Sequence, residues 1–297
     1  MSEFLSRAKS LVPEQIKAPL RRLLDPQSRE EPMSGYEHEL GMFVLQQAEE
    51  FSASRGGRPE ALHAECVRNA ILHQKCLTQM NEASQFVQTA FMPDYERSLF
   101  DYYRLQQYLM LITFLSYPFR GAGCLRSHVS PFVVGASRLS CVRALDYGAG
   151  IPFGLIYLLQ TCPNKVESIT IVDLDLIHVE LSEYILSRLS PRTDLVVLRR
   201  TDTETVPDLG DQTFNLVYGK DIFEHVHDPE RVLREILSRA APSCIGYFDI
   251  KDHGAKYLQH VHPELSDLLQ VMDEYSFAPT GVVAGLSGFA RTAQPRP

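Results

Sequence analysis

The feature that most constrains the fold is the alternation of strand-like and helix-like patterns from about Ser140 to the end of the chain. Short apolar runs rich in β-branched residues alternate with segments whose apolar residues recur at three- and four-residue spacing. Strands that alternate with helices form a parallel sheet covered on both faces, and right-handed crossovers leave few other topologies. The last two runs, 281–284 and 288–292, predict a terminal hairpin. We therefore predict an α/β, doubly wound, mostly parallel sheet over residues 140–297.

Residues 1–139 have a different pattern, which is helical throughout. The apolar spacing predicts one helix over Tyr36–Ser52, a second that begins near Pro59, and a third from Pro93 that Pro118 ends. We expect this region to form a helical N-terminal cap that selects the substrate. Its first segment, residues 4–24, has a basic amphipathic pattern, which is compatible with peripheral contact with an anionic membrane. Docking of that segment on the protein itself or on a second copy, as in a homodimer, is the alternative.

Charge and composition exclude several classes of protein. The 297 residues carry 29 basic and 37 acidic side chains, a formal net charge of −8, which argues against a nucleic-acid binder. No apolar run approaches the roughly 20 residues that span a bilayer, and no secretory signal is recognisable. The six cysteines are scattered without a Cys-x-x-Cys pair, so we expect reduced thiols and a cytoplasmic protein.

Polar residues follow three successive predicted strands. Asp146 precedes a turn with Gly148 and Gly150, Asp173 ends the second strand, and the pair Asp202 and Thr203 follows the third. Ligands of open α/β sheets bind at these carboxyl ends, and three acidic positions there suit an adenosine-containing ligand. A nicotinamide dinucleotide is one alternative, but its fingerprint requires a glycine at position 153, which is Phe153. An acid before the glycines also suits an amine or sulfonium better than a pyrophosphate.

Three segments together resemble the class I S-adenosylmethionine-dependent methyltransferases. They are Leu145-Asp-Tyr-Gly-Ala-Gly, Ile171-Val-Asp-Leu-Asp, and the long run from Thr213 to Glu230. The resemblance covers residues 140–297 in outline, implies a seven-stranded sheet, and does not cover residues 1–139. Asn215 stands where relatives commonly carry an aspartate, and we expect it to be structural.

The resemblance implies a role for each matching position. Asp146, Gly148 and Gly150 would line the methionine moiety of S-adenosylmethionine, and Asp173 would bind the ribose hydroxyls. The remaining implied contacts are Leu174 against the adenine, Asp202 and Thr203 at the adenine edge, and Gly219 and Lys220 beside the methionine end. The implied reaction is methyl transfer to a small-molecule acceptor, for which we expect O-methylation.

A hydroxyl acceptor requires activation by a base or a metal. Asp221, Glu224 and His225 have the spacing of one helical turn and predict a site for a divalent cation such as Mg²⁺, as in some quinone-pathway O-methyltransferases. The alternative is a general base, for which His225 and His253 are the candidates. An NAD(P)-dependent oxidoreductase and a non-catalytic cofactor-binding scaffold protein are the other functions compatible with the sequence.

Overall fold

The computed structural model describes residues 35–57, 59–70, 107–120, 122–201, 206–250, 265 and 267–292. The predicted helix over Tyr36–Ser52 is confirmed as α3 (Gly35–Ser54). The helix predicted from Pro59 begins with the short 3-10 helix η1 (Pro59–Ala61) and continues through 62–70. Of the third predicted helix, the described part is α6 (Gln107–Leu115), followed by η2 (Tyr117–Phe119) and α7 (Ala122–Ser137). Residues 4–24, for which we predicted membrane or dimer contact, lie outside the described residues.

The seven-stranded sheet has the order β3-β2-β1-β4-β5-β7-β6, which confirms the predicted fold class. The first five strands are parallel, and β7 runs antiparallel to both β5 and β6 as the predicted hairpin. The strands are β1 (Val142–Tyr147), β2 (Val166–Leu174), β3 (Asp194–Arg200), β4 (Phe214–Gly219), β5 (Ala240–Phe248), β6 (Phe277–Val283) and β7 (Leu286–Arg291). Strand order reverses between β1 and β4, so a ligand site is expected at the carboxyl ends of these two strands.

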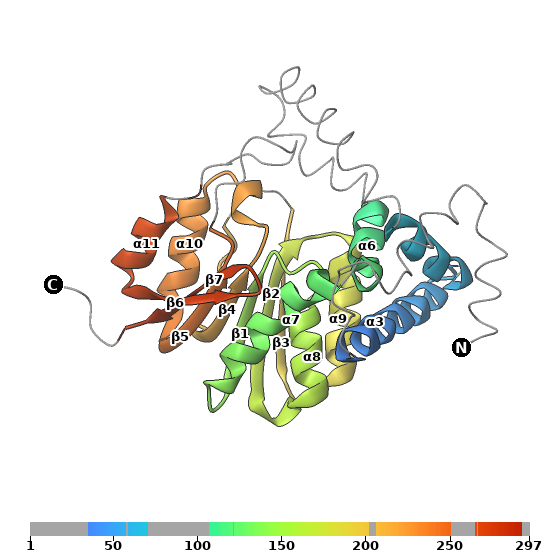
Figure 1. Cartoon of the computed structure of the whole chain (residues 1–297), viewed down its shortest axis with the longest axis horizontal. Helices are drawn as coiled ribbons and strands as arrows, with labels where there is room; N and C mark the ends of the chain where they lie inside the picture. Colours follow the sequence, from blue (N-terminus) through green and yellow to red (C-terminus); the bar gives the residue numbers. More distant parts are fainter. Residues whose placement is uncertain are drawn as a thin grey trace, which may run out of the picture.

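Helices cover both faces of this sheet (Figure 1). The helices and 3-10 turns of this part are α8 (Phe153–Thr161), η3 (Pro163–Lys165), α9 (Ile177–Leu189), η4 (Phe223–His225), α10 (Pro229–Ser238) and α11 (Leu268–Glu274). Buried side chains of β1 alternate between two hydrophobic clusters, since Ala144 packs with α7, α8 and α9 while Leu145 packs with α10 and α11. By the same alternation Asp146 of β1 and Tyr218 of β4, which are register partners, lie on the α7–α9 side.

The N-terminal helices share the core of the sheet. Leu40 of α3, Leu115 of α6 and Phe132 of α7 belong to the same buried cluster as Ile169 and Leu216 of the strands. On the surface, α3 lies beside α9, and Arg188 of α9 contacts Glu50 of α3 at 3.4 Å. The boundary predicted after residue 139 therefore separates two sequence patterns but not two hydrophobic cores.

Asn215 has the structural role expected of it. Its Oδ1 accepts a hydrogen bond from the backbone N–H of Arg143 at 2.8 Å, and its Nδ2 donates to the carbonyl of Cys141 at 2.9 Å. Asn215 thus ties the start of β4 to the start of β1, at the edge of the sheet opposite to the carboxyl ends. In the described ranges, every helix is too short or too polar to cross a membrane.

Candidate active site

The turn after β1 is held against the end of β2. Gly148 and Gly150 have φ of +73° and +53°, a left-handed conformation that favours glycine. The N–H of Gly150 donates to Oδ2 of Asp173 at 2.6 Å, and the N–H of Leu174 donates to Oδ1 at 2.6 Å. Burial alone would raise the pKa of the Asp173 carboxyl, but His178, whose Nε2 lies 3.4 Å away, and these two N–H groups outweigh it and lower that pKa. Asp173 is therefore an ionised carboxylate with lone pairs left for further donors.

Asp146 is the second acidic group of this site. Unlike Asp173, it is not stabilised by hydrogen-bond donors from the part of the chain that the structure describes. It is 1% exposed, and its Oδ1 makes no hydrogen bond to any described residue. Burial, together with the negative charge of Asp173, raises the pKa of Asp146 well above its ordinary value. A buried carboxyl oxygen without a donor costs free energy. A cationic donor placed beside Asp146 and Asp173 would remove that cost.

A third group of polar side chains lies at the carboxyl end of β4. The Nζ of Lys220 lies 3.2 Å from Nε2 of His128 on α7 and 3.0 Å from Oδ2 of Asp221. The ring nitrogen Nδ1 of His128 lies 3.3 Å from the hydroxyl of Tyr218, which donates to the carbonyl of Ser127 at 3.3 Å. Because an ammonium only donates, Nε2 of His128 accepts from Lys220, and the ring proton sits on Nδ1 facing Tyr218. Burial and the positive charge of Lys220 lower the pKa of His128 to about 3, so this imidazole is neutral.

Aromatic rings of α6 and η2 connect these groups. A Cβ built on Gly150 would lie 3.0 Å from the ring of Phe114, and the same ring packs against His178 with centroids 5.3 Å apart. Phe114 also meets Tyr117 edge-on, and Tyr117 stacks on His128 with centroids 5.2 Å apart. Phe114 and Tyr117 are both partly buried. Phe114 and Tyr117 therefore form an aromatic wall that begins at the glycine turn, and His128 connects this wall to Lys220.

The family comparison identifies this arrangement. Residues 145–244, which run from β1 into β5 and include Asp146, Asp173 and Lys220, match the family model described as a methyltransferase domain. Over residues 145–244 the chain is similar to a methyltransferase domain, and its sheet has the doubly wound order of the class I fold. The match favours a methyltransferase over the nicotinamide-dependent alternative, and the resemblance of the sequence motifs implies S-adenosylmethionine as the cofactor.

Solved structures with the same fold resemble larger parts of the chain. A SAM-dependent methyltransferase from Aquifex aeolicus is 18% identical, with a TM-score of 0.40, over 56% of this chain and 90% of that one. The pyocyanin biosynthetic protein PhzM is 13% identical, with a TM-score of 0.49, over 76% of this chain and 72% of that one. Among curated protein sequences, none matches the chain.

The methyltransferase domain fits S-adenosylmethionine at the positions that the structure describes. Oδ1 of Asp146 is a buried acceptor in need of a cationic donor, which the ammonium of the methionine moiety would supply. Asp173 keeps lone pairs for the ribose hydroxyls, and a Cβ on Gly148 would lie 2.8 Å from the side chain of Ile222. Leu174 is buried at the end of β2. Asp202 and Thr203, predicted at the adenine edge, lie outside the described residues.

Two of the residues predicted to flank the methionine end, Gly219 and Lys220, lie at the carboxyl end of β4. Gly219 is the last residue of the strand, and its carbonyl accepts from the N–H of Asp249 at 3.1 Å. Lys220 follows directly, but its ammonium lies against a histidine from outside the matched segment. The side chain of Lys220 therefore joins the methyltransferase domain to the N-terminal helices.

The structure does not support the predicted cation site. The carboxylate of Asp221, at a φ of +51°, faces Lys220, whereas Glu224 is 1% exposed in η4 and lies 3.8 Å from Nε2 of His225. Within the described ranges, no group of three or more His, Cys, Asp and Glu side chains is placed to hold a metal ion. The spacing of one α-helical turn does not apply, because only Phe223–His225 is helical and it is 3-10. Of the two predicted bases, His225 lies beside Glu224, and His253 is outside the described residues.

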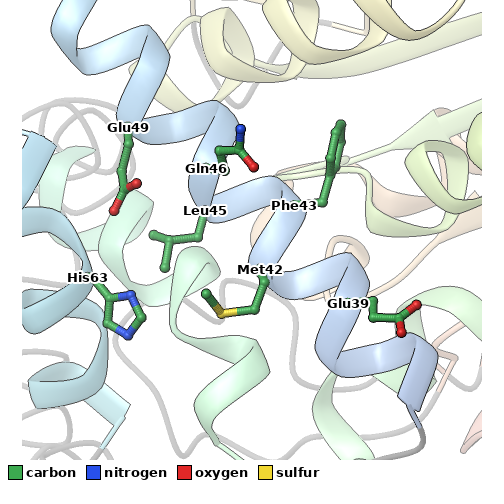
Figure 2. A pocket seen from close by; sticks show the side chains of 7 residues that line it. All are labelled: Glu39, Met42, Phe43, Leu45, Gln46, Glu49 and His63. Atoms are coloured by element: carbon green, nitrogen blue, oxygen red, sulfur yellow. The ribbon is translucent and has the colours of Figure 1, made fainter. Parts of the chain in front are cut away.

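Several residues of the site were not predicted from the sequence. His128, Phe114 and His178 carry no motif, and Tyr117 was one of many tyrosines with helical spacing. For His178 a weak signal existed, because it comes five residues after Asp173 in the first turn of the following helix. A separate surface pocket of about 510 Å³ lies between α3 and His63, and none of the site residues lines it (Figure 2).

Proposed function

We propose that the chain transfers the methyl group of S-adenosylmethionine to an oxygen of a small-molecule acceptor. The observation that carries this proposal is the pair of acids at the switch point, Asp173 held ionised by the glycine turn and Asp146 buried with an oxygen that lacks a donor. When bound, S-adenosylmethionine supplies the methyl group and its sulfur takes the electron pair of the bond that breaks. Asp146 would hold its ammonium, and Asp173 would hold its ribose.

The N-terminal helices supply the acceptor side in this proposal. Phe114 of α6, Tyr117 of η2 and His128 of α7 lie next to the glycine turn and to Lys220, and all three come from outside the matched segment. Aromatic walls exclude water and fix the plane of a bound ring, and orientation contributes much of the acceleration in a displacement reaction. The role of residues 1–139 in acceptor selection therefore stays part of the proposal, as does a cytoplasmic location, which the five described free cysteines support.

His225 and His253 stay the candidates for accepting the proton of an acceptor that binds as the neutral hydroxyl. If an imidazole accepts it, the rate rises with pH through a pKa near ~6.5, because only the neutral ring accepts a proton. Comparing His225→Ala with His253→Ala shows which ring is required. An acceptor that is already ionised requires neither.

The experiment that tests the proposed function has two stages. Calorimetry with S-adenosylhomocysteine, the demethylated product, measures cofactor binding without an acceptor. Isotope-labelled S-adenosylmethionine is then incubated with the protein and a small-molecule extract, and mass spectrometry locates the labelled product. We expect binding and a labelled O-methyl compound. Absence of binding contradicts the function, and binding without any labelled product favours the scaffold alternative.

A further inference from the structure

The ammonium of Lys220 is held in place by its neighbours and still has a donor to offer. Two of its three N–H bonds are directed to His128 and Asp221, at 3.2 and 3.0 Å. Lys220 makes no third hydrogen bond to a residue that the structure describes, and its side chain is 18% exposed. A lysine ammonium carries three donors. One N–H of Lys220 is therefore available to a ligand at the carboxyl end of β4.

The neighbours of Lys220 fix its position as well as its charge. Nε2 of His128 can only accept here, and its Nδ1–H is directed to Tyr218, so the imidazole cannot turn away without losing both contacts. The same burial and charge that keep His128 neutral make it a poor base. His128 is thus a positioning residue for Lys220 and does not take the proton of the acceptor.

The surroundings indicate which part of the reaction Lys220 serves. Its partner His128 stacks on Tyr117, which meets Phe114, and these three residues belong to the helices that we assign to the acceptor. Both rings of the wall are partly buried, and Tyr117 stacks on the imidazole that the Lys220 ammonium contacts. A flat aromatic ligand that carries a negative oxygen matches a wall of this kind with a cation at its end.

We propose that Lys220 binds the anionic oxygen of the acceptor, and that the acceptor is an aromatic hydroxyl compound bound as its phenolate between Phe114, Tyr117 and the ammonium. This inference rests on the proposed function and narrows it to a substrate class. The phenol loses its proton to water before the reaction. A lone pair of its oxygen then forms the bond to the methyl carbon as the sulfur–carbon bond breaks, and the negative oxygen and positive sulfonium both become neutral.

Lys220 keeps its proton throughout this reaction. The product ether has no negative charge, so its hydrogen bond to the ammonium is weaker than that of the phenolate. The same contact that holds the substrate therefore favours release of the product. This differs from a general base, which would have to change protonation state in every turnover.

The test uses 4-nitrophenol as the probe and 4-nitroanisole, its neutral methyl ether, as the matched control ligand. Both are titrated into the full-length protein saturated with S-adenosylhomocysteine, at a pH below the pKa of free 4-nitrophenol. We expect 4-nitrophenol to bind with the absorption band of the phenolate and to bind at least about tenfold more tightly than the ether. Lys220→Met should abolish the phenolate band, and Lys220→Arg, which keeps the charge, should retain it.

Two further variants separate positioning from folding. Lys165→Met removes the other described lysine, which precedes β2 at the opposite edge of the sheet, and should change nothing. His128→Gln should weaken 4-nitrophenol binding in the wild type but have no further effect in Lys220→Met, because it acts through Lys220. Melting temperatures of all variants identify any loss that is due to unfolding.

The outcomes are distinguishable from those of the proposed function. If S-adenosylhomocysteine fails to bind the wild type, the proposed function fails. If it binds, any of three results overturns the inference about Lys220. The first is that the wild type does not bind 4-nitrophenol, and the second is that it binds 4-nitrophenol as the neutral phenol. The third result is that Lys220→Met binds 4-nitrophenol with the same affinity as the wild type. A loss of S-adenosylhomocysteine affinity in Lys220→Met with unchanged 4-nitrophenol binding would assign the ammonium to the cofactor and would overturn it too.

Discussion

Asp173 accepts a hydrogen bond of 2.6 Å from the backbone N–H of Gly150, which ties the end of one strand to the turn after its neighbour. On the other side of that turn, the hydroxyl of Ser182 donates to the carbonyl of Gly150 at 2.9 Å. Both peptide groups of this glycine are thus fixed by residues of β2 and α9. The turn that is expected to receive the cofactor is therefore shaped before any ligand binds, which lowers the entropic cost of binding.

Replacing Asp173 by alanine should weaken binding of S-adenosylhomocysteine. The variant loses the charge-assisted hydrogen bonds to the ribose, worth about 1.5–3 kcal/mol, which corresponds to about ten- to a hundredfold in affinity. Calorimetry measures the change. Asp175→Ala is the matched control, because Asp175 lies two residues further on and is directed to Arg199 at 2.9 Å. Unchanged affinity in Asp173→Ala would remove Asp173 from the cofactor site.

Asp146 should make cofactor binding depend on pH. Its pKa in the folded protein is raised by burial and by the negative charge of Asp173. A bound ammonium favours the ionised form, and affinity should therefore rise with pH through the raised pKa, with release of a proton. Calorimetry in two buffers of different ionisation enthalpy measures that proton. Asp146→Asn should release none and should bind S-adenosylhomocysteine at least about tenfold more weakly.

The same carboxyl predicts a stability change of defined sign. As pH rises from the ordinary to the raised pKa of Asp146, the unfolded chain loses its proton before the folded protein does, so the stability that this group contributes is lost. Asp146→Asn cannot ionise, and its unfolding free energy should lack this decline. Thermal melts of both proteins without ligand, over a series of pH values, compare the slopes. Parallel slopes would show that Asp146 is ionised in the free protein.

Activity should not depend on a divalent cation at Asp221, Glu224 and His225. The carboxylate of Asp221 already faces the ammonium of Lys220, and Glu224 is buried in η4. Methyl transfer measured with the acceptor found by labelling should be the same with EDTA as with added Mg²⁺. A loss of activity in chelator that Mg²⁺ restores would show that these side chains rearrange around a metal.

The contact between α7 and α8 should be sensitive to a single methyl group. A Cβ on Gly154 would lie 2.0 Å from the ring of Phe132 and 2.5 Å from the carbonyl oxygen of His128. Gly154→Ala should therefore destabilise the fold by about 1–3 kcal/mol, since the backbone must move. Denaturant unfolding measures the loss. A Cβ on Gly210 would meet nothing within 4 Å. Gly210→Ala should therefore reduce the free energy of unfolding only by the strain of placing alanine in the left-handed backbone conformation, at φ +64°.

The sequence by itself determined the helices and strands of the sheet region and the polar residues at the carboxyl ends of the strands. Periodicity of two and of 3.6 residues sets strands and helices locally, and the right-handed crossover then leaves few ways to order five parallel strands. That Asp146 and Asp173 lie together could be predicted, because each lies near the end of a strand and parallel strands end at the same edge of the sheet.

Only the tertiary structure decided which side chains meet across the site. His128 and Lys220 are 92 residues apart, and their contact depends on how α7 packs against β4. The same holds for Phe114 over Gly150 and for Asp221, which the local spacing placed with Glu224 and His225 but which faces Lys220 instead. The physical reason is that local periodicity fixes the face of each element, whereas the partner of a polar side chain depends on the packing of distant elements and on the charge that must be balanced once it is buried.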